Sequence, residues 1–123
     1  MFYDVKKKNH NLPHDPFKAI VAPRPIGWIS TLAANGDFNL APYSFFNAVS
    51  DNPHIVMFSS VGWKDSATNA KQTGEFVCNY VGEINEIQMN ATSVHAPPNI
   101  NEADYVGIEL APSTMVKPPR VKD

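Results

Sequence analysis

Hydroxyl, amide and lysine side chains gather where an apolar strand is expected to give way to a helix. Ser59 and Ser60 end an apolar run, Gly62 follows, and the chain then reads KDSATN over residues 64–69. The start of a helix offers unpaired backbone N–H groups and the positive end of the helix dipole, so it attracts anions. The residue types therefore indicate a phosphate site, in which Asp65 would cap the helix because a carboxylate repels phosphate.

Glycine spacing sets limits on this site. The six glycines fit neither GxxxxGK[ST] nor GxGxxG, so the sequence indicates neither a P-loop NTPase nor a Rossmann dinucleotide domain. The alternative to an anion site is an ordinary capped helix that carries serine and threonine on its surface. The residues alone leave both interpretations open.

A second group with chemical potential is the segment APYSFFNAVS, residues 41–50. The Asn47 side chain both donates and accepts hydrogen bonds, and a small residue such as Ala48 lets backbone N–H and C=O groups approach a ligand. Such an edge can pair with a flat heterocycle that carries imide groups. The alternative is that Phe45 and Phe46 fill the core.

The remaining candidates are isolated side chains. The four histidines have no ligand spacing and a single cysteine cannot form a zinc site, so no metal site is predicted: His10, His14, His54, His95 and Cys78. Cys78 lies in an apolar strand and is predicted to be a buried thiol. Arg24, in a stiff proline-flanked segment, either reaches an anion or faces water.

Composition excludes several classes of protein. The 123 residues suit one domain, and their formal net charge of −2 argues against a nucleic-acid partner, which usually requires a basic surplus. No apolar run approaches the roughly 20 residues of a membrane helix, and no apolar stretch follows Lys6–Lys8 as in a signal peptide. A cytoplasmic protein with no membrane partner is expected.

The first half of the chain reads as extended structure. β-Forming residues over Ile26–Leu32, the dipeptide Asn35-Gly36 and the returning Phe38–Tyr43 predict an antiparallel hairpin with a type I′ turn. Phe45–Val49 is predicted as the next strand. The apolar run His54–Ser60 is predicted as a central strand covered on both faces.

Helices are expected only after this run. Asp65 as N-cap and Gly74 as terminator predict one helix, Glu75–Val81 is predicted as a strand, and Glu83–Ala91 as a second helix. This order lacks the strict alternation of a doubly wound parallel sheet. It favours an antiparallel barrel or sheet that carries a few peripheral helices.

The chain is predicted to be a single domain over residues 1–123, with an N-terminal extension over 1–18 and a loop-rich region over 94–123. Within that region, short extended pieces are expected at Val106–Leu110 and Thr114–Val116. The final residues KPPRVKD are predicted to be a solvated connector.

Four motifs, read together, carry a family resemblance. They are VAPRPIGWIST from Val21, the Asn-Gly turn, APYSFFNAVSDNPHIVMFSS from Ala41, and KDSATNAKQTGEFVCNYV from Lys64. In this order they resemble the flavin reductase-like, FMN-binding split-barrel family, which includes flavoredoxins and NAD(P)H:flavin oxidoreductases. The resemblance covers about Leu12 to Ser93. It implies a mainly β fold with peripheral helices, an antiparallel split β-barrel of Greek-key character, and a homodimer with FMN, or loosely held FAD, near its interface.

The resemblance also implies which residues contact the flavin. The isoalloxazine ring would face Ser44, Phe46, Asn47 and Ala48. The ribityl chain would lie near Ser59 and Ser60. The phosphate would be held by Lys64, Ser66, Thr68 and Asn69. Arg24 and Trp28 belong to the first barrel strand.

The activity implied is hydride transfer from NAD(P)H to flavin, in which the cofactor carries the chemistry and the protein supplies orientation. No catalytic residue is therefore predicted. A partner monooxygenase or other electron acceptor would consume the reduced flavin. The alternatives are a non-enzymatic FMN-binding electron carrier of flavoredoxin type and a non-functional fragment of the fold. Family domains continue beyond the length of this chain, so a C-terminally short, incomplete barrel is expected.

Overall fold

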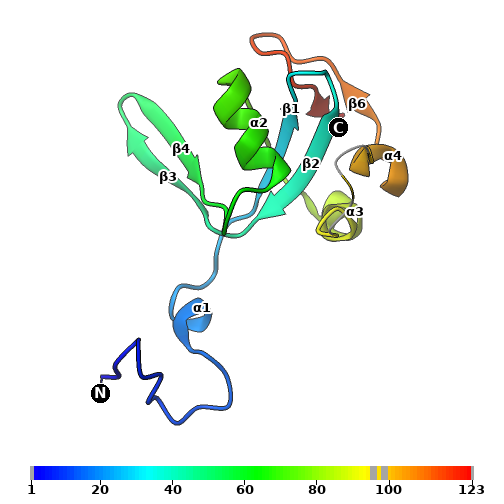
Figure 1. The fold of residues 1–123 in the computed structure, drawn as a ribbon. Coiled ribbons are helices and arrows are strands. Elements are labelled where there is room, and N and C mark those ends of the chain that lie inside the picture. Colours follow the sequence, from blue (N-terminus) through cyan, green and yellow to red (C-terminus); the bar gives the residue numbers. More distant parts are fainter. Residues whose placement is uncertain (1, 95–96, 98–99, 123) are drawn as a thin grey trace.

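A computed structural model describes residues 2–94, 97 and 100–122 (Figure 1). Its strands are β1 (Gly27–Leu32), β2 (Phe38–Tyr43), β3 (Phe46–Asp51), β4 (His54–Phe58), β5 (Val77–Asn79), β6 (Leu110–Ala111) and β7 (Arg120–Val121). Its helices are α1 (Phe17–Ile20), α2 (Asp65–Thr73), α3 (Glu86–Ala91) and α4 (Glu102–Val106), with a 3₁₀ turn η1 (Glu83–Asn85) before α3. The prediction of a mainly β fold with peripheral helices is confirmed. No helix of the described residues is long and apolar enough to cross a membrane.

The central element is an antiparallel sheet with the strand order β2-β1-β5. Its middle strand β1 is rich in β-forming residues, and five of its six residues are buried. The register pairs Gly27 with Tyr43 on one side of β1 and Trp28 with Asn79 on the other. The predicted hairpin of residues 26–43 is therefore confirmed.

Alternation along β1 sends successive side chains to two different layers. Thr31 accepts a hydrogen bond from Asn69 of α2, which covers one face of the sheet (Figure 1). Trp28 points to the other face, where it clusters with Leu40, Ala103 of α4 and Val121 of β7. The core thus lies between the sheet and the C-terminal third of the chain.

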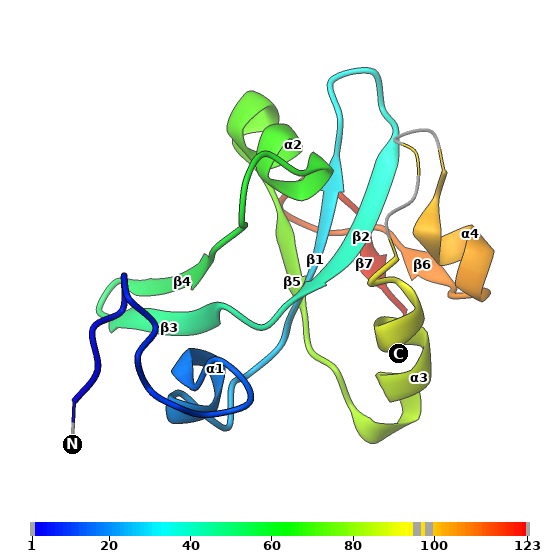
Figure 2. The same ribbon diagram turned by 60° about the horizontal axis from the view of Figure 1, so that its bottom comes forward.

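The buried side-chain amide of Asn79 connects this core, and Figure 2 shows β5, which carries it, together with β1 and β7. Its Nδ2 donates to the Trp28 carbonyl at 2.9 Å and to the Ser30 hydroxyl at 3.2 Å, while its Oδ1 accepts from the Val121 N–H at 2.8 Å. Within the part of the chain that the structure describes, β7 forms a ladder with β6, and Asn79 supplies a hydrogen bond that fastens this short strand beside the central sheet.

The C-terminal residues are not a solvated connector, and that prediction is wrong. Pro118 is fully buried, and Val121 is only 9% exposed. The Ser30 hydroxyl donates to the Pro119 carbonyl at 2.7 Å, and the Glu75 carboxylate accepts from the Lys117 N–H at 3.1 Å. The segment is held by polar groups distant in sequence, which its own composition does not indicate.

Two further predictions in this region are wrong. Val106 ends helix α4 instead of beginning a strand, because the Asn101 side chain caps that helix by accepting from the Ala103 N–H at 3.0 Å. Thr114–Val116 forms bends, and the second strand here is β7.

The apolar run after Pro53 is also not a central strand. β4 pairs with β3 alone, in a two-stranded ribbon that stands apart from the sheet (Figures 1 and 2). Ile55, Val56 and Met57 are 44–49% exposed. The three sheets do not join into a closed barrel within the described residues.

Two local predictions fail for reasons of geometry. Leu32 pairs with Phe38, so the hairpin loop is longer than a type I′ turn, and Gly36 has a left-handed φ of 94° whereas Asn35 does not. Cys78 is exposed because it lies on the face of β5 opposite to that of the buried Asn79; partial burial still raises the pKa of its thiol. β5 is also shorter than predicted, whereas the predicted helix ending at Gly74 and the one over residues 83–91 are confirmed.

Replacing Asn79 with alanine tests the link between the sheet and β7. The change leaves a buried N–H and a buried C=O without their partner, and each such loss costs roughly 1–3 kcal/mol. We expect Asn79→Ala to lower the free energy of unfolding by about 2–4 kcal/mol in urea denaturation. Asn90→Ala, at an exposed position, should change it by less than about 0.5 kcal/mol. Equal stability of the two variants would contradict this role.

Glu102 links α4 to the sheet from a buried position. Its residue is only 6% exposed, and its carboxylate accepts a hydrogen bond from the Leu40 N–H at 3.1 Å. Burial raises the pKa of this carboxyl above the ordinary 4.5 and the nearby Asp65 charge adds to the rise, while bonds from its own N–H and that of Leu40 oppose it. The charged form therefore destabilises the folded state relative to the protonated form.

This sign gives a pH dependence. Because the folded-state pKa of Glu102 is raised, its contribution to stability is fully present below about pH 4.5 and decreases as the pH rises through the folded-state value. Glu102→Gln removes the charge and keeps an acceptor for the Leu40 N–H. The melting temperature of this variant minus that of the wild type should therefore increase between pH 4 and pH 7. Glu83→Gln, at an exposed position, provides the matched control. A difference that stays constant with pH would refute the assignment.

Candidate functional site

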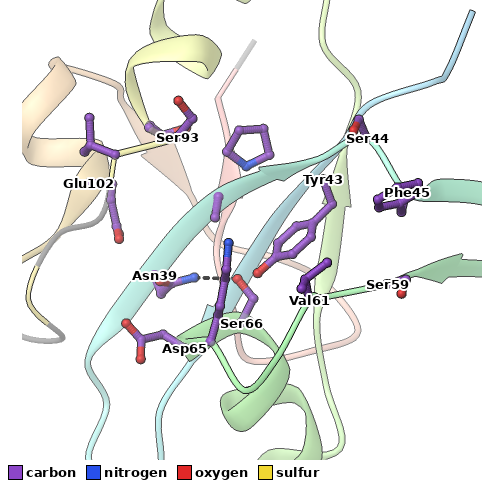
Figure 3. A pocket seen from close by; sticks show the side chains of 15 residues that line it. Asn39, Tyr43, Ser44, Phe45, Ser59, Val61, Asp65, Ser66, Ser93 and Glu102 are labelled. Carbon is purple, nitrogen blue, oxygen red and sulfur yellow. Dashed lines mark hydrogen bonds between the residues drawn. The ribbon is translucent and has the colours of Figure 1, made fainter. Parts of the chain in front are cut away.

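A cavity of about 310 Å³ opens where β2 ends, β3 begins and α2 begins (Figure 3). Four of the predicted flavin-contacting residues line it: Ser44, Ser59, Lys64 and Ser66. They come from the β2–β3 corner, the end of β4 and the start of α2. The fold therefore brings together parts of both motifs that the sequence singled out.

The N-terminus of α2 lies at this cavity without a side-chain cap. Lys64 occupies the N-cap position in an extended conformation, and Asp65 is the first helical residue. The expectation that Asp65 caps the helix is therefore wrong. The first helical bond runs from the Thr68 N–H to the Lys64 carbonyl at 2.9 Å, so the amides of residues 65–67 have no acceptor within the helix. This arrangement attracts an anion.

Polar pairs beneath α2 fix its direction. The Asn39 side-chain N–H donates to the Ser66 hydroxyl oxygen at 2.8 Å, and the Asn69 side-chain N–H donates to the Thr31 hydroxyl oxygen at 3.2 Å. Ser66 and Asn69 are both buried, whereas Thr68 is half-buried and does not line the cavity. Asn69 therefore points toward the sheet, while the Ser66 hydroxyl keeps its proton to donate.

The predicted ring-contacting residues divide between the cavity and the ribbon. Ser44 lines the cavity, whereas Asn47 and Ala48 are exposed on β3 and pair with residues of β4. Phe46 is half-buried against Gly27, where an added Cβ would lie 2.5 Å from the Phe46 ring. Only glycine at position 27 leaves room for this ring.

A small aromatic group joins the ribbon to the sheet below the cavity. The Phe58 ring lies 5.0 Å from that of Tyr43 and 5.1 Å from that of Phe76, measured between centroids. Edge and tilted contacts at such distances are favourable. The end of β4, with Ser59 and Ser60 directly after it, is therefore anchored, although most of the ribbon is exposed.

Sequence reasoning missed two buried polar residues at the site. Asn39 and Glu102 line the cavity and lie 8% and 6% exposed. Figure 3 shows both side chains directed into the hollow near Asp65. The capping signal Asn101-Glu102 could have located the start of α4, but the alternation of β2 alone does not reveal that Asn39 lines the cavity.

Arg24 and Trp28 have partners within the protein. One terminal nitrogen of Arg24 donates to the Lys18 carbonyl at 2.8 Å, and the guanidinium lies over the Phe45 ring at 5.7 Å. The sequence left open whether Arg24 binds an anion or faces water. In the structure its guanidinium instead contacts a backbone carbonyl and an aromatic ring of the same chain. Trp28 is fully buried, with its indole N–H bonded to Thr92 at 2.9 Å.

The described residues hold no group of three or more His, Cys, Asp or Glu side chains that could bind a metal ion. His95 lies outside the described residues. Chemically, the cavity offers amide and hydroxyl donors and one lysine at the helix start, with an aromatic side chain and the Ser44 hydroxyl at its other end. It can bind a molecule that carries both an anion and a flat ring.

Comparison with known proteins agrees with this geometry. The family model described as a flavin reductase like domain matches residues 21–123. An uncharacterized protein of Aquifex aeolicus (strain VF5) is 38% identical over 128 aligned positions, which cover all of this chain and 65% of that protein. A second relative, from Halalkalibacterium halodurans, is 34% identical and is covered over 57% of its length. The chain thus spans about three fifths of the length of these relatives.

Solved structures show the same fold. Nitrilotriacetate monooxygenase component B of Bacillus cereus superposes with a TM-score of 0.81 at 30% identity, over 93% of this chain and 60% of the other. The 2-nitrobenzoate 2-nitroreductase of Pseudomonas fluorescens gives 0.85 at 30% identity, over 100% and 60%. A split-barrel protein of Shewanella frigidimarina gives 0.83 at 20% identity, over 100% and 64%. The fold is that of the split-barrel flavin reductases, and the chain belongs to the flavin reductase-like domain family.

Proposed function

We propose that this chain binds FMN and is part of an NAD(P)H-dependent flavin reductase. The observation that supports this most is the cavity that places an uncapped helix start with Lys64 and Ser66 opposite Ser44 and Phe45. Family membership supports flavin as the ligand that combines a phosphate with a flat ring. Bound flavin supplies the hydride-accepting ring, and the protein binds and orients it.

In this proposal the phosphate end is held by α2. Lys64 supplies the positive charge, and the amides of residues 65–67 and the Ser66 hydroxyl donate hydrogen bonds. Thr68 is assigned to the phosphate on the sequence resemblance alone, since it does not line the cavity. Asn69 acts by anchoring the helix to Thr31. Asp65 and Glu102 place carboxylates near the same cavity, which limits the number of phosphates it can accept. This favours FMN over FAD at this position.

The ring end is assigned to the start of β3, and the ribityl chain to the end of β4. Ser44 would offer its hydroxyl to the isoalloxazine ring from the cavity wall, and Phe46, Asn47 and Ala48, which do not line the cavity, would reach the ring from the adjoining ribbon. Ser59 and Ser60 would lie along the ribityl hydroxyls. None of these side chains must transfer a proton for hydride to pass between two cofactors, so their role is to position the ring and exclude water.

The fate of the reduced flavin is proposed from a neighbour's name. A solved structure at 30% identity is named as component B of a nitrilotriacetate monooxygenase. By analogy, the reduced flavin formed here would pass to a partner monooxygenase or another electron acceptor.

Two measurements on the purified chain test this function. We expect added FMN to bind with a shift in its visible spectrum, and NADH or NADPH to be oxidised in its presence, because the cavity holds the flavin for direct hydride transfer. Oxidation at background level with FMN bound would instead favour the electron carrier of flavoredoxin type. Absence of FMN binding would reject the proposal.

A variant pair tests the phosphate end specifically. Lys64→Ala combined with Thr68→Ala should weaken FMN binding about tenfold or more, because bonds to charged groups contribute roughly 1.5–3 kcal/mol. Riboflavin lacks the phosphate, so its affinity should hardly change. Lys6→Ala removes an exposed lysine that does not line the cavity, and it is the matched control. Equal weakening of FMN and riboflavin would argue against the assignment.

We further propose that the β3–β4 ribbon is covered by a second copy of the chain. A two-stranded ribbon is only marginally stable alone, and this one exposes Val49, Ile55, Val56 and Met57. Ser44 and Phe46 lie at the base of the same ribbon, so a second copy would also enclose the flavin site.

Solution mass tests this arrangement. Light scattering on the wild-type chain should give twice the monomer mass of 13.6 kDa. Met57→Asp introduces a charge on the ribbon and should give a monomer, because burying an unpaired charge is unfavourable. Ile87→Asp, at a side chain 82% exposed on α3, should remain dimeric. A monomeric wild-type chain, or dissociation caused equally by both variants, would refute the proposed interface.

A further inference from the structure

A second cavity, of about 470 Å³, lies between the end of β4 and the flank of α2. Its walls include Phe58, Ser60, Trp63, Ala67 and Ala70, and it shares only Ser59 with the cavity of the proposed flavin site. Its volume is in the range of small-molecule sites, roughly 300–1,000 Å³. Of the residues that the flavin proposal uses, Ser59 and Ser60 line this space, and its other walls are not part of that proposal.

Trp63 is the principal side chain of this second cavity. Trp63 is 72% exposed, although tryptophan is a large and mostly apolar side chain. The Lys71 ammonium lies 4.7 Å from the centroid of its ring. Lys71 does not line the cavity, so its ammonium contacts the Trp63 ring without filling the cavity that this ring lines. A cation–π contact of this kind orients an otherwise mobile indole.

The other walls include two alanines and one phenylalanine. Ala67 and Ala70 are three residues apart on α2, so their methyl groups lie on one face of the helix. Phe58 is fixed by its ring contacts with Tyr43 and Phe76. Together with Trp63 these side chains line the second cavity, here called the slot, with aromatic and methyl surfaces on which a planar ring can stack.

Polar groups at the slot narrow the class of ring. The Ser60 hydroxyl donates its proton to the Gly62 carbonyl at 2.9 Å, so its oxygen is left to accept a hydrogen bond from a ligand. The α2 N-terminus lies within one and a half turns of the slot, but the flavin proposal already assigns its lysine and free amides to the FMN phosphate. A ring that carries an amino group satisfies the remaining feature, the free acceptor of the Ser60 hydroxyl.

We propose that this slot binds the adenine ring of an adenine nucleotide, stacked on Trp63. The inference rests on the proposed function in that NAD(P)H is the nucleotide that would use it, with adenine in the slot and nicotinamide directed toward the flavin cavity across Ser59. The binding itself needs no flavin, so it can be tested separately.

Adenosine and ribose 5-phosphate are the probes, and tryptophan fluorescence is the measurement. The chain has two tryptophans, of which Trp28 is fully buried, so a ligand on the surface reports through Trp63. We expect adenosine to quench the fluorescence saturably. Calorimetry should show that Trp63→Ala weakens adenosine binding about tenfold or more, the usual effect of removing an aromatic platform, and that Trp63→Phe restores part of it. Ribose 5-phosphate should bind the two variants equally.

Controls separate this proposal from the flavin site. Tyr80→Ala removes a side chain that is 91% exposed and lines neither cavity, so it should leave adenosine binding unchanged. Trp63→Ala should retain FMN affinity. Adenosine that fails to bind at millimolar concentration, or that binds Trp63→Ala as well as the wild type, overturns the adenine slot even if FMN binds. Loss of FMN binding alone would instead reject the flavin proposal.

Discussion

The buried Asn79 amide is the interaction on which the architecture depends. Its N–H groups donate to two groups of β1, and its oxygen accepts from β7. One side chain of β5 therefore joins the central sheet to β7, which belongs to a different sheet. A buried amide is favourable only when its donors and acceptor are all satisfied. This requirement fixes the position of the C-terminal segment to within hydrogen-bond distance, and that segment completes the core around Trp28.

The same principle positions the cavity. α2 rests on the sheet through amide–hydroxyl pairs, Asn39 with Ser66 and Asn69 with Thr31, in place of a continuous apolar stripe. Directional bonds hold the helix at one angle, with its N-terminus at the cavity. Residues that a ligand-based reading assigns to cofactor binding thus also contribute to the fold, since a hydroxyl such as that of Ser66 can accept from Asn39 and still donate its own proton.

The sequence predicted those elements whose cause is local. The β1–β2 hairpin follows from β-forming residues around a glycine turn, and α2 follows from its composition and the left-handed Gly74. The C-terminal strand was missed because its partners, Ser30, Glu75 and Asn79, lie far away in the chain. The apolar residues of β4 predicted a strand covered on both faces, and that prediction is wrong because composition does not show whether another element of the chain covers a strand.

For the site, the sequence located the helix start and the β2–β3 corner, and the structure brings parts of both to one cavity. Asn39 and Glu102 could not be predicted there, since their approach depends on the docking of α4 against β2. The hydrogen-bond partner of Asn69 could not be predicted either. Asn69 lies in the segment predicted to bind phosphate, yet its side chain donates to Thr31.

The contact between Gly27 and Phe46 limits the order in which these two positions can be substituted during evolution. The missing side chain at one position is filled by the ring of the other, so neither position is free to vary alone. A side chain at position 27 would become acceptable only after the ring at 46 had been replaced by something smaller, and a return to phenylalanine would then be blocked. The order of substitutions, and not only their identity, is thereby constrained at the base of the ribbon.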